Sequence, residues 1–245
     1  MSDWPKLMLA LDVPRNELDA VMEELGGVVP CFKVGLNTIT SPHLPEVVSK
    51  VLATGSSLFL DGKLYDIPNT VANSARSLVQ LGARYFTVHA SGGRDMMKAA
   101  KEAAAERADQ IGLAHTPLPI AVTVLTSMDE ETWNGLFSCK VSLEDQVLRF
   151  VEVALSAGVN AVVASPLEVE AIRARFGKDI AVVTPGVRPL WAAKGDQKRI
   201  AEPGKTMERG ASSLVIGRPI LFPPKEIGSR RNAVDRIAEE IGGLR

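Results

Sequence analysis

The residues Asp61, Lys63 and Asp66 form an Asp-x-Lys-x-x-Asp motif that ends a short apolar run. Asp61 and Lys63 are two positions apart, so in an extended chain their side chains lie on the same face. Each ammonium in such a set favours the ionised form of its neighbouring carboxylate, and each carboxylate favours the protonated ammonium. The motif therefore predicts a charged lysine that can donate a proton inside a fixed negative field, without metal or cofactor.

Two more charged residues stand in other apolar runs. Asp12 ends the first run, and Lys33 lies within the second. If these runs are neighbouring parallel strands, both side chains can converge with Asp61 and Lys63 at one end of the sheet. Any one of these residues alone is equally well a solvated rim residue, and Asp66 equally well a helix cap. The alternation of acid and base across the set favours the functional interpretation.

Eight short apolar runs, rich in β-branched residues, predict the strands that carry these side chains. Their apolar residues follow one another without alternation, which is typical of strands buried on both faces. The runs cover residues 6–12, 31–35, 57–61, 85–89, 120–125, 161–164, 180–184 and 213–217. Between them, helical spacing of apolar residues predicts helices over 17–25, 45–52, 71–81, 96–108, 143–157, 167–176, 205–209 and 231–241.

Eight strand–helix units in 245 residues, about 31 residues per unit, predict an α/β fold of one domain, a (β/α)8 TIM barrel spanning residues 1–245. A doubly wound open sheet is the alternative. It normally has fewer strands, and a glycine-rich turn often follows its first strand. Here the first run ends in Leu11-Asp12-Val13-Pro14. Barrel enzymes place their chemistry at the carboxyl ends of the strands, where these charged residues fall.

The composition limits the class of partner. The chain has 28 Lys and Arg against 29 Asp and Glu, and this balance offers no general surface for a polyanion. Nucleic acid is therefore not expected as the main partner. Two cysteines make neither a disulfide framework nor a zinc motif, which fits a cytoplasmic protein. The first apolar run is too short for a signal peptide, and no run is long enough to predict a membrane span.

The charged motif continues as Ile67-Pro68-Asn69-Thr70, and the run 61–70 resembles the signature of the bacterial-type, monofunctional orotidine 5′-phosphate decarboxylases. The resemblance extends along the whole chain in order. Other matching pieces are Leu9-Ala10-Leu11-Asp12, Phe32-Lys33-Val34-Gly35, Val88-His89-Ala90, Thr123-Val124-Leu125-Thr126-Ser127, Thr184-Pro185-Gly186-Val187-Arg188 and Val215-Ile216-Gly217-Arg218-Pro219-Ile220. Asp-x-Lys-x-x-Asp alone is typical of a wider superfamily of phosphosugar barrels. The continuation Ile67-Pro68-Asn69-Thr70 narrows the resemblance to the decarboxylase family.

The resemblance implies a homodimer that converts orotidine 5′-phosphate to UMP and CO2 in pyrimidine biosynthesis, with no cofactor and no metal. It implies that Lys63 is the general acid that protonates C6, and that Asp61 lies near the departing carboxylate. Lys33 and Asp12 would contact the ribose hydroxyls, and Lys33 would also join the charge network.

The resemblance also assigns the remaining contacts. Asp66, Ile67 and Thr70 would reach into the partner's site. Thr126 and Ser127 would meet the ligand, with Ser127 near the edge of the pyrimidine. The phosphate side would be formed by Arg188, Gln197, Gly217 and Arg218. Barrel phosphate sites are built from the loops after strands 7 and 8, and arginine suits bidentate phosphate contact. The segment 185–199 is long for a barrel loop and is interpreted as a lid.

Two other functions stay open at this point. A sister lyase acting on a sugar phosphate, such as a keto-gulonate phosphate decarboxylase or a hexulose phosphate synthase, uses a metal-stabilised enediolate. It would need more carboxylates at the barrel mouth than the predicted ends of strands 4, 5, 6 and 8 supply. A non-catalytic nucleotide-binding barrel would have no use for the combination of Lys63, Asp61 and Asp66.

Overall fold

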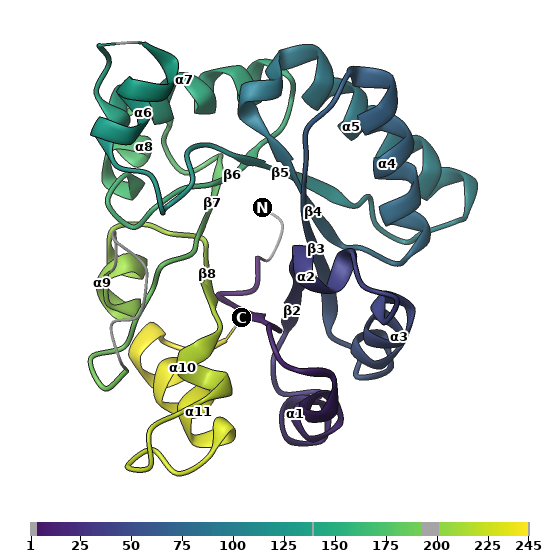
Figure 1. Cartoon of the computed structure of the whole chain (residues 1–245), viewed down its shortest axis with the longest axis vertical. Coiled ribbons are helices and arrows are strands. Elements are labelled where there is room, and N and C mark those ends of the chain that lie inside the picture. The colour runs from purple at the N-terminus through teal and green to yellow at the C-terminus, as the bar shows by residue number, and fades with distance from the viewer. Residues whose placement is uncertain (1–3, 139, 193–200, 245) are drawn as a thin grey trace.

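A computed structural model describes residues 4–138, 140–192 and 201–244. Eight parallel strands form a closed barrel in which each strand pairs with the next and the first pairs with the last (Figure 1). The strands are β1 (Leu7–Ala10), β2 (Cys31–Val34), β3 (Ser57–Leu64), β4 (Tyr85–His89), β5 (Leu118–Val122), β6 (Ala161–Val163), β7 (Ala181–Thr184) and β8 (Ser213–Ile216). The predicted (β/α)8 barrel and all eight of its strands are confirmed.

Helices surround the barrel and cover the outside of the strands (Figure 1). They are α1 (Leu18–Leu25), α2 (Leu36–Ile39), α3 (Leu44–Ala53), α4 (Pro68–Gln80), α5 (Gly93–Gln110), α6 (Glu130–Phe137), α7 (Leu143–Ser156), α8 (Val169–Phe176), α9 (Pro203–Glu208), α10 (Arg218–Leu221) and α11 (Arg230–Ile241), with 3-10 turns at Arg15–Glu17 and Ala90–Gly92. No helix in these ranges has the length and apolar character needed to cross a membrane.

Local sequence explains where the helices begin and which face they bury. The hydroxyl of Ser142 accepts a hydrogen bond from the Asp145 amide at the start of α7, as a helix cap does. Val147, Val151 and Ala154 of α7 are fully buried and recur at helical spacing. The helix therefore turns one apolar stripe toward the barrel.

Three helices were not predicted from the sequence. α2 and α10 have four residues each, too few to show an apolar repeat. α6 does carry a start signal, because the Asp129 carboxylate accepts from the Thr132 amide. The predicted bounds of three strands also need correction: β1 ends at Ala10 instead of Asp12, β3 runs on to Leu64 instead of ending at Asp61, and β5 covers Leu118–Val122 instead of 120–125.

Aromatic side chains fill the axis of the barrel. Trp4 stacks on Tyr85 with ring centroids 4.8 Å apart, and Phe59 meets Tyr85 edge-on at 6.3 Å. This Trp4–Tyr85–Phe59 column packs with Met8 and Ile120 inside the strands. A cavity of about 600 Å³ lies at the carboxyl end, and Phe59 is part of its lining. A larger hollow of about 810 Å³ lies beside Trp4 at the amino end, the end that serves stability in barrel enzymes.

Candidate active site

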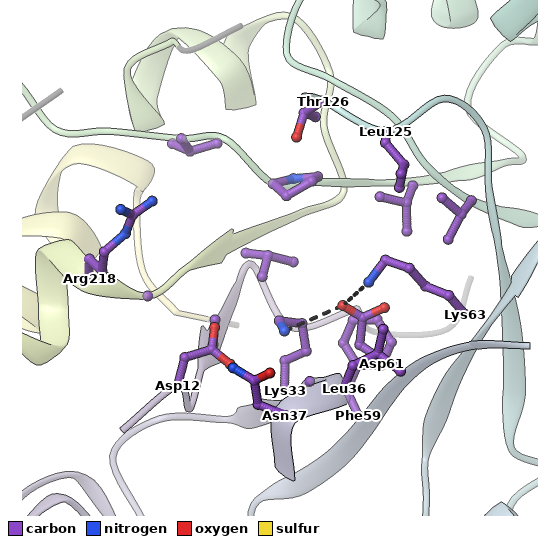
Figure 2. A pocket seen from close by; sticks show the side chains of 18 of the residues that line it. Asp12, Lys33, Leu36, Asn37, Phe59, Asp61, Lys63, Leu125, Thr126 and Arg218 are labelled. Carbon is purple, nitrogen blue, oxygen red and sulfur yellow. Dashed lines mark hydrogen bonds and ion pairs between the residues drawn. The ribbon is translucent and has the colours of Figure 1, made fainter. Parts of the chain in front are cut away.

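The cavity at the carboxyl end collects charged and polar side chains from strands on all sides of the barrel mouth (Figure 2). Of the residues predicted to form a site, eight line it: Asp12, Lys33, Asp61, Lys63, Thr126, Arg188, Gly217 and Arg218. They come from segments far apart in the sequence, and the closed barrel is what brings them together. The predicted convergence of the charged residues from the first three strands is therefore present in the structure.

A carboxylate shared by two lysines forms the centre of the charged group. Asp61 Oδ2 lies 2.8 Å from Lys63 Nζ and 3.4 Å from Lys33 Nζ. The side chains of Lys33 and Asp61 are only 12% and 13% exposed, and that of Lys63 is 28% exposed. Partial burial strengthens these attractions relative to water. The other carboxylate oxygen, Oδ1, accepts a hydrogen bond of 2.9 Å from the hydroxyl of Thr87.

Asp61 stays ionised despite its burial. Burial alone would raise the pKa of its carboxyl group, but Lys33, Lys63 and the hydrogen bonds from Lys63 and Thr87 outweigh that effect. The net result is a pKa below the ordinary aspartate value. At neutral pH the cavity therefore holds a fixed negative charge between two ammonium groups.

Gly35 leaves the space in which Asp12 and Lys33 lie, and the sequence analysis did not select it as a site residue. A Cβ atom on Gly35 would stand 3.2 Å from both Asp12 Oδ1 and Lys33 Nζ, a tighter contact than side chains normally tolerate. Asn37, just beyond Gly35, projects into the cavity beside Asp12 (Figure 2). The sequence signals for Gly35 are its place at the end of the second apolar run and in the matching piece Phe32-Lys33-Val34-Gly35.

An arginine stands across the cavity from Lys63. Figure 2 shows Arg218, the first residue of α10, on the far side of the pocket from Lys63 and Asp61. Arg188 also lines the cavity and is 8% exposed. Gly217 allows the end of β8 to lie against β1, since a Cβ there would come within 3.1 Å of the Ala10 side chain. The site thus has two cationic ends.

Part of the predicted phosphate segment can be placed. Residues 193–200, and with them the predicted contact Gln197, lie outside the described residues. The chain before residues 193–200 contacts the chain after them, because the Arg188 amide donates to the Ala201 carbonyl at 2.9 Å. The interpretation of 185–199 as a lid stays a prediction.

Four predicted residues do not line the cavity of their own chain. Ser127 is exposed, just beyond the lining residue Thr126. Asp66, Ile67 and Thr70 are exposed on the segment that leads into α4 and through its first turn. The Asp66 carboxylate accepts from the Ile67 amide at 2.7 Å. Ile67 is the residue at the helix cap position and no side chain caps the helix, so Asp66 is not its cap.

An apolar wall completes the cavity and was missed as part of the site. It consists mainly of Phe59, Val122, Val124, Leu125, Val163, Val187 and Val215. In the sequence these residues are indistinguishable from barrel core, because every strand is apolar throughout. Among the described residues, no group of three or more His, Cys, Asp and Glu side chains is arranged to hold a metal ion.

A closed (β/α)8 barrel with a charged cavity at the carboxyl ends of its strands defines a barrel enzyme of the kind that acts on small anionic substrates. The model of the Orotidine 5′-phosphate decarboxylase / HUMPS family matches residues 5–226. The chain therefore belongs to this family.

Individual relatives agree over the full length. The orotidine 5′-phosphate decarboxylase of Heliobacterium modesticaldum is 43% identical, over 96% of this chain and 95% of its own. That of Syntrophomonas wolfei is 42% identical, over 98% and 100%. The crystal structure of the Lactobacillus acidophilus orotidine 5′-phosphate decarboxylase superposes with a TM-score of 0.81 at 33% identity, covering 98% of this chain and 100% of that one.

Proposed function

We propose that this chain converts orotidine 5′-phosphate to UMP and CO2 in pyrimidine biosynthesis, without a metal or cofactor, in the cytoplasm. The observation that carries the proposal is the Asp61 carboxylate held between Lys63 and Lys33 at one side of the cavity, with Arg218 across from it. The names of the full-length relatives support the same reaction.

The proposed chemistry centres on Lys63. When the C6–carboxylate bond breaks, CO2 leaves and the electron pair stays on C6. The Lys63 ammonium stabilises that charge and transfers a proton from Nζ to C6, and water later returns a proton to the lysine. Asp61 lies near the departing carboxylate and keeps Lys63 in place at 2.8 Å. The wall formed by Val122, Leu125 and Val163 excludes water, which strengthens the charge interactions.

The remaining groups of the substrate have proposed partners along the cavity. Asp12 and Lys33 bind the ribose hydroxyls, and Thr126 contacts the nucleotide. Ser127 is proposed to approach the pyrimidine edge. The phosphate binds on the opposite side, to Arg188, Gln197, Gly217 and Arg218. Placing the two ends of the nucleotide on opposite sides orients C6 toward Lys63.

The site is proposed to be completed by a second copy of the chain. In a two-fold dimer, Asp66, Ile67 and Thr70 of each subunit would enter the cavity of the other. The proposal is supported by their exposure and by their position outside the cavity of their own chain. Ile67 is 66% exposed and its neighbour Tyr65 is 62% exposed, so the same segment offers apolar area to a partner.

The direct test is an absorbance assay with orotidine 5′-phosphate after exhaustive EDTA treatment. We expect full turnover to UMP, because a lysine supplies the proton and the charge. Activity that disappears with EDTA and returns with a divalent metal would instead support the sugar-phosphate lyases. Binding of UMP with no turnover would identify a nucleotide-binding barrel.

Arg218→Ala tests the phosphate side. A lost charge-assisted contact of about 1.5–3 kcal/mol corresponds to a fall in kcat/KM of roughly 10- to 100-fold for orotidine 5′-phosphate. The phosphate-free nucleoside orotidine should be turned over as in the wild type, and steady-state kinetics with both substrates measures the difference. Arg175→Ala is a matched control, because Arg175 pairs with Glu152 on the outer surface. Equal losses for both substrates would remove Arg218 from the phosphate site.

A further inference from the structure

A register irregularity in the barrel places one buried hydroxyl at the centre of the charged group. Leu60 of β3 pairs with Phe86 of β4, and Leu64 pairs with Val88. Between these pairs β3 has Asp61, Gly62 and Lys63, whereas β4 has Thr87 alone. Such bulges re-aim side chains next to active sites. Thr87 is fully buried, so its hydroxyl depends on protein partners.

The chemistry of the partners fixes the direction of both hydrogen bonds of Thr87. An ionised carboxylate only accepts, so the Thr87 hydroxyl donates to Asp61 Oδ1, at 2.9 Å. A backbone amide only donates, so the same oxygen accepts from the Lys63 N–H, at 2.8 Å. One hydroxyl therefore links the side chain of Asp61 to the main chain of Lys63, across the irregular part of β3.

These two bonds account for the geometry of the Asp61–Lys63 pair. Lys63 has a φ of 49°, in the left-handed region, which is unfavourable for a residue with a side chain. The bond from its N–H to Thr87 holds this conformation, from which Nζ turns back to Asp61 Oδ2. Because Thr87 occupies Oδ1, the oxygen left facing both lysines is Oδ2.

We propose that Thr87 is a positioning residue: its hydroxyl sets the orientation of the Asp61 carboxylate and of Lys63, and thereby the rate of the chemical step. Thr87 does not line the cavity and acts through these two residues. The expected effect on the rate rests on the proposed function. The expected effect on the orientation of Asp61 and Lys63 rests on the geometry alone.

Thr87→Val removes the hydroxyl and keeps the shape of the side chain. We expect kcat for orotidine 5′-phosphate to fall by about 10- to 100-fold, as small displacements of reacting groups do. KM for the substrate and Kd for UMP should change by less than about threefold, because the Thr87 hydroxyl makes no hydrogen bond to a residue proposed to bind the ribose or the phosphate. Thr87→Ser keeps the hydroxyl and should keep kcat within about threefold of the wild type.

Thr123→Val is the matched control. Thr123 is a buried threonine of the same barrel, 3% exposed, whose hydroxyl donates to the Val163 carbonyl instead of to the charged group. If a general loss of barrel stability explained the result, both valine variants would lower kcat alike. Should Thr87→Val fail to fold, the pair Thr87→Ala and Thr87→Ser isolates the hydroxyl in the same way.

An unchanged kcat in Thr87→Val, or a serine variant as impaired as the valine variant, would overturn the proposal. If the wild type itself does not decarboxylate orotidine 5′-phosphate, the proposed function fails, and a crystal structure of Thr87→Val then decides the positioning role. A left-handed Lys63 that still contacts Asp61 at hydrogen-bond distance would overturn it, and separation of the two side chains would support it.

Discussion

Lys63→Ala is expected to lower kcat for orotidine 5′-phosphate by at least about three orders of magnitude, the combined effect of a lost proton donor and a lost positive charge at C6. Lys33 stays in the variant, 3.4 Å from Asp61, so the cavity keeps one ammonium group. The Lys33 ammonium has a proposed role at the ribose and is not expected to replace Lys63 as the proton donor.

The measurement combines single-turnover kinetics with titration calorimetry of UMP. UMP should still bind, because its ribose and phosphate contacts do not involve Lys63. Lys98→Ala is a suitable control, because Lys98 pairs with Glu102 on the exposed side of α5. A kcat near that of the wild type in Lys63→Ala would exclude Lys63 as the general acid, whereas loss of UMP binding would show a disturbed cavity instead.

The second large effect is recovery of activity in mixed dimers. Lys63→Ala and Asp66→Asn are each expected to be severely impaired alone. When the two variants are dissociated and re-formed together, about half of the dimers are mixed under random pairing. If Asp66 serves the partner's site, one site of each mixed dimer has intact Lys63 and intact Asp66. Roughly a quarter of all sites should then regain full activity.

A second pair of variants supplies the control. Asp61 and Lys63 of one chain lie 2.8 Å apart in the same cavity, so mixing Lys63→Ala with Asp61→Asn leaves one defect in every site. This mixture should recover nothing. Subunit exchange must be verified in both mixtures, for example by energy transfer between labelled chains. If subunits exchange but the mixture of Lys63→Ala and Asp66→Asn regains no activity, Asp66 does not contribute to the partner's site.

The sequence predicts those parts of the site that depend on strand order. Asp12, Lys33 and Asp61 stand at or near the carboxyl ends of consecutive parallel strands, so a closed barrel necessarily brings them to one mouth. The roles of Thr87 and Gly35 do not follow from strand order. The role of Thr87 follows from a register shift between two strands, and that of Gly35 from a close approach of two side chains. Neither feature leaves a periodic trace in the chain.

The helices also divide into those that the sequence predicts and those that it does not. Long amphipathic segments such as α7 are predicted because tertiary packing demands an apolar stripe. α2 and α10 hold residues at the mouth but are single turns, too short to show an apolar repeat. The sequence does not distinguish the apolar wall of the cavity from the core, because valine is common in barrel strands at both kinds of position.

The aromatic column along the barrel axis affects how substrate enters and how products leave the proposed enzyme. Trp4, Tyr85 and Phe59 pack together across the barrel axis, so among the described residues the cavity does not continue through the barrel to the amino end. In the proposed reaction, orotidine 5′-phosphate enters, and UMP and CO2 leave, at the carboxyl end of the barrel. A bound product thus bars the next substrate, and the exit of UMP sets the moment at which each new cycle can begin.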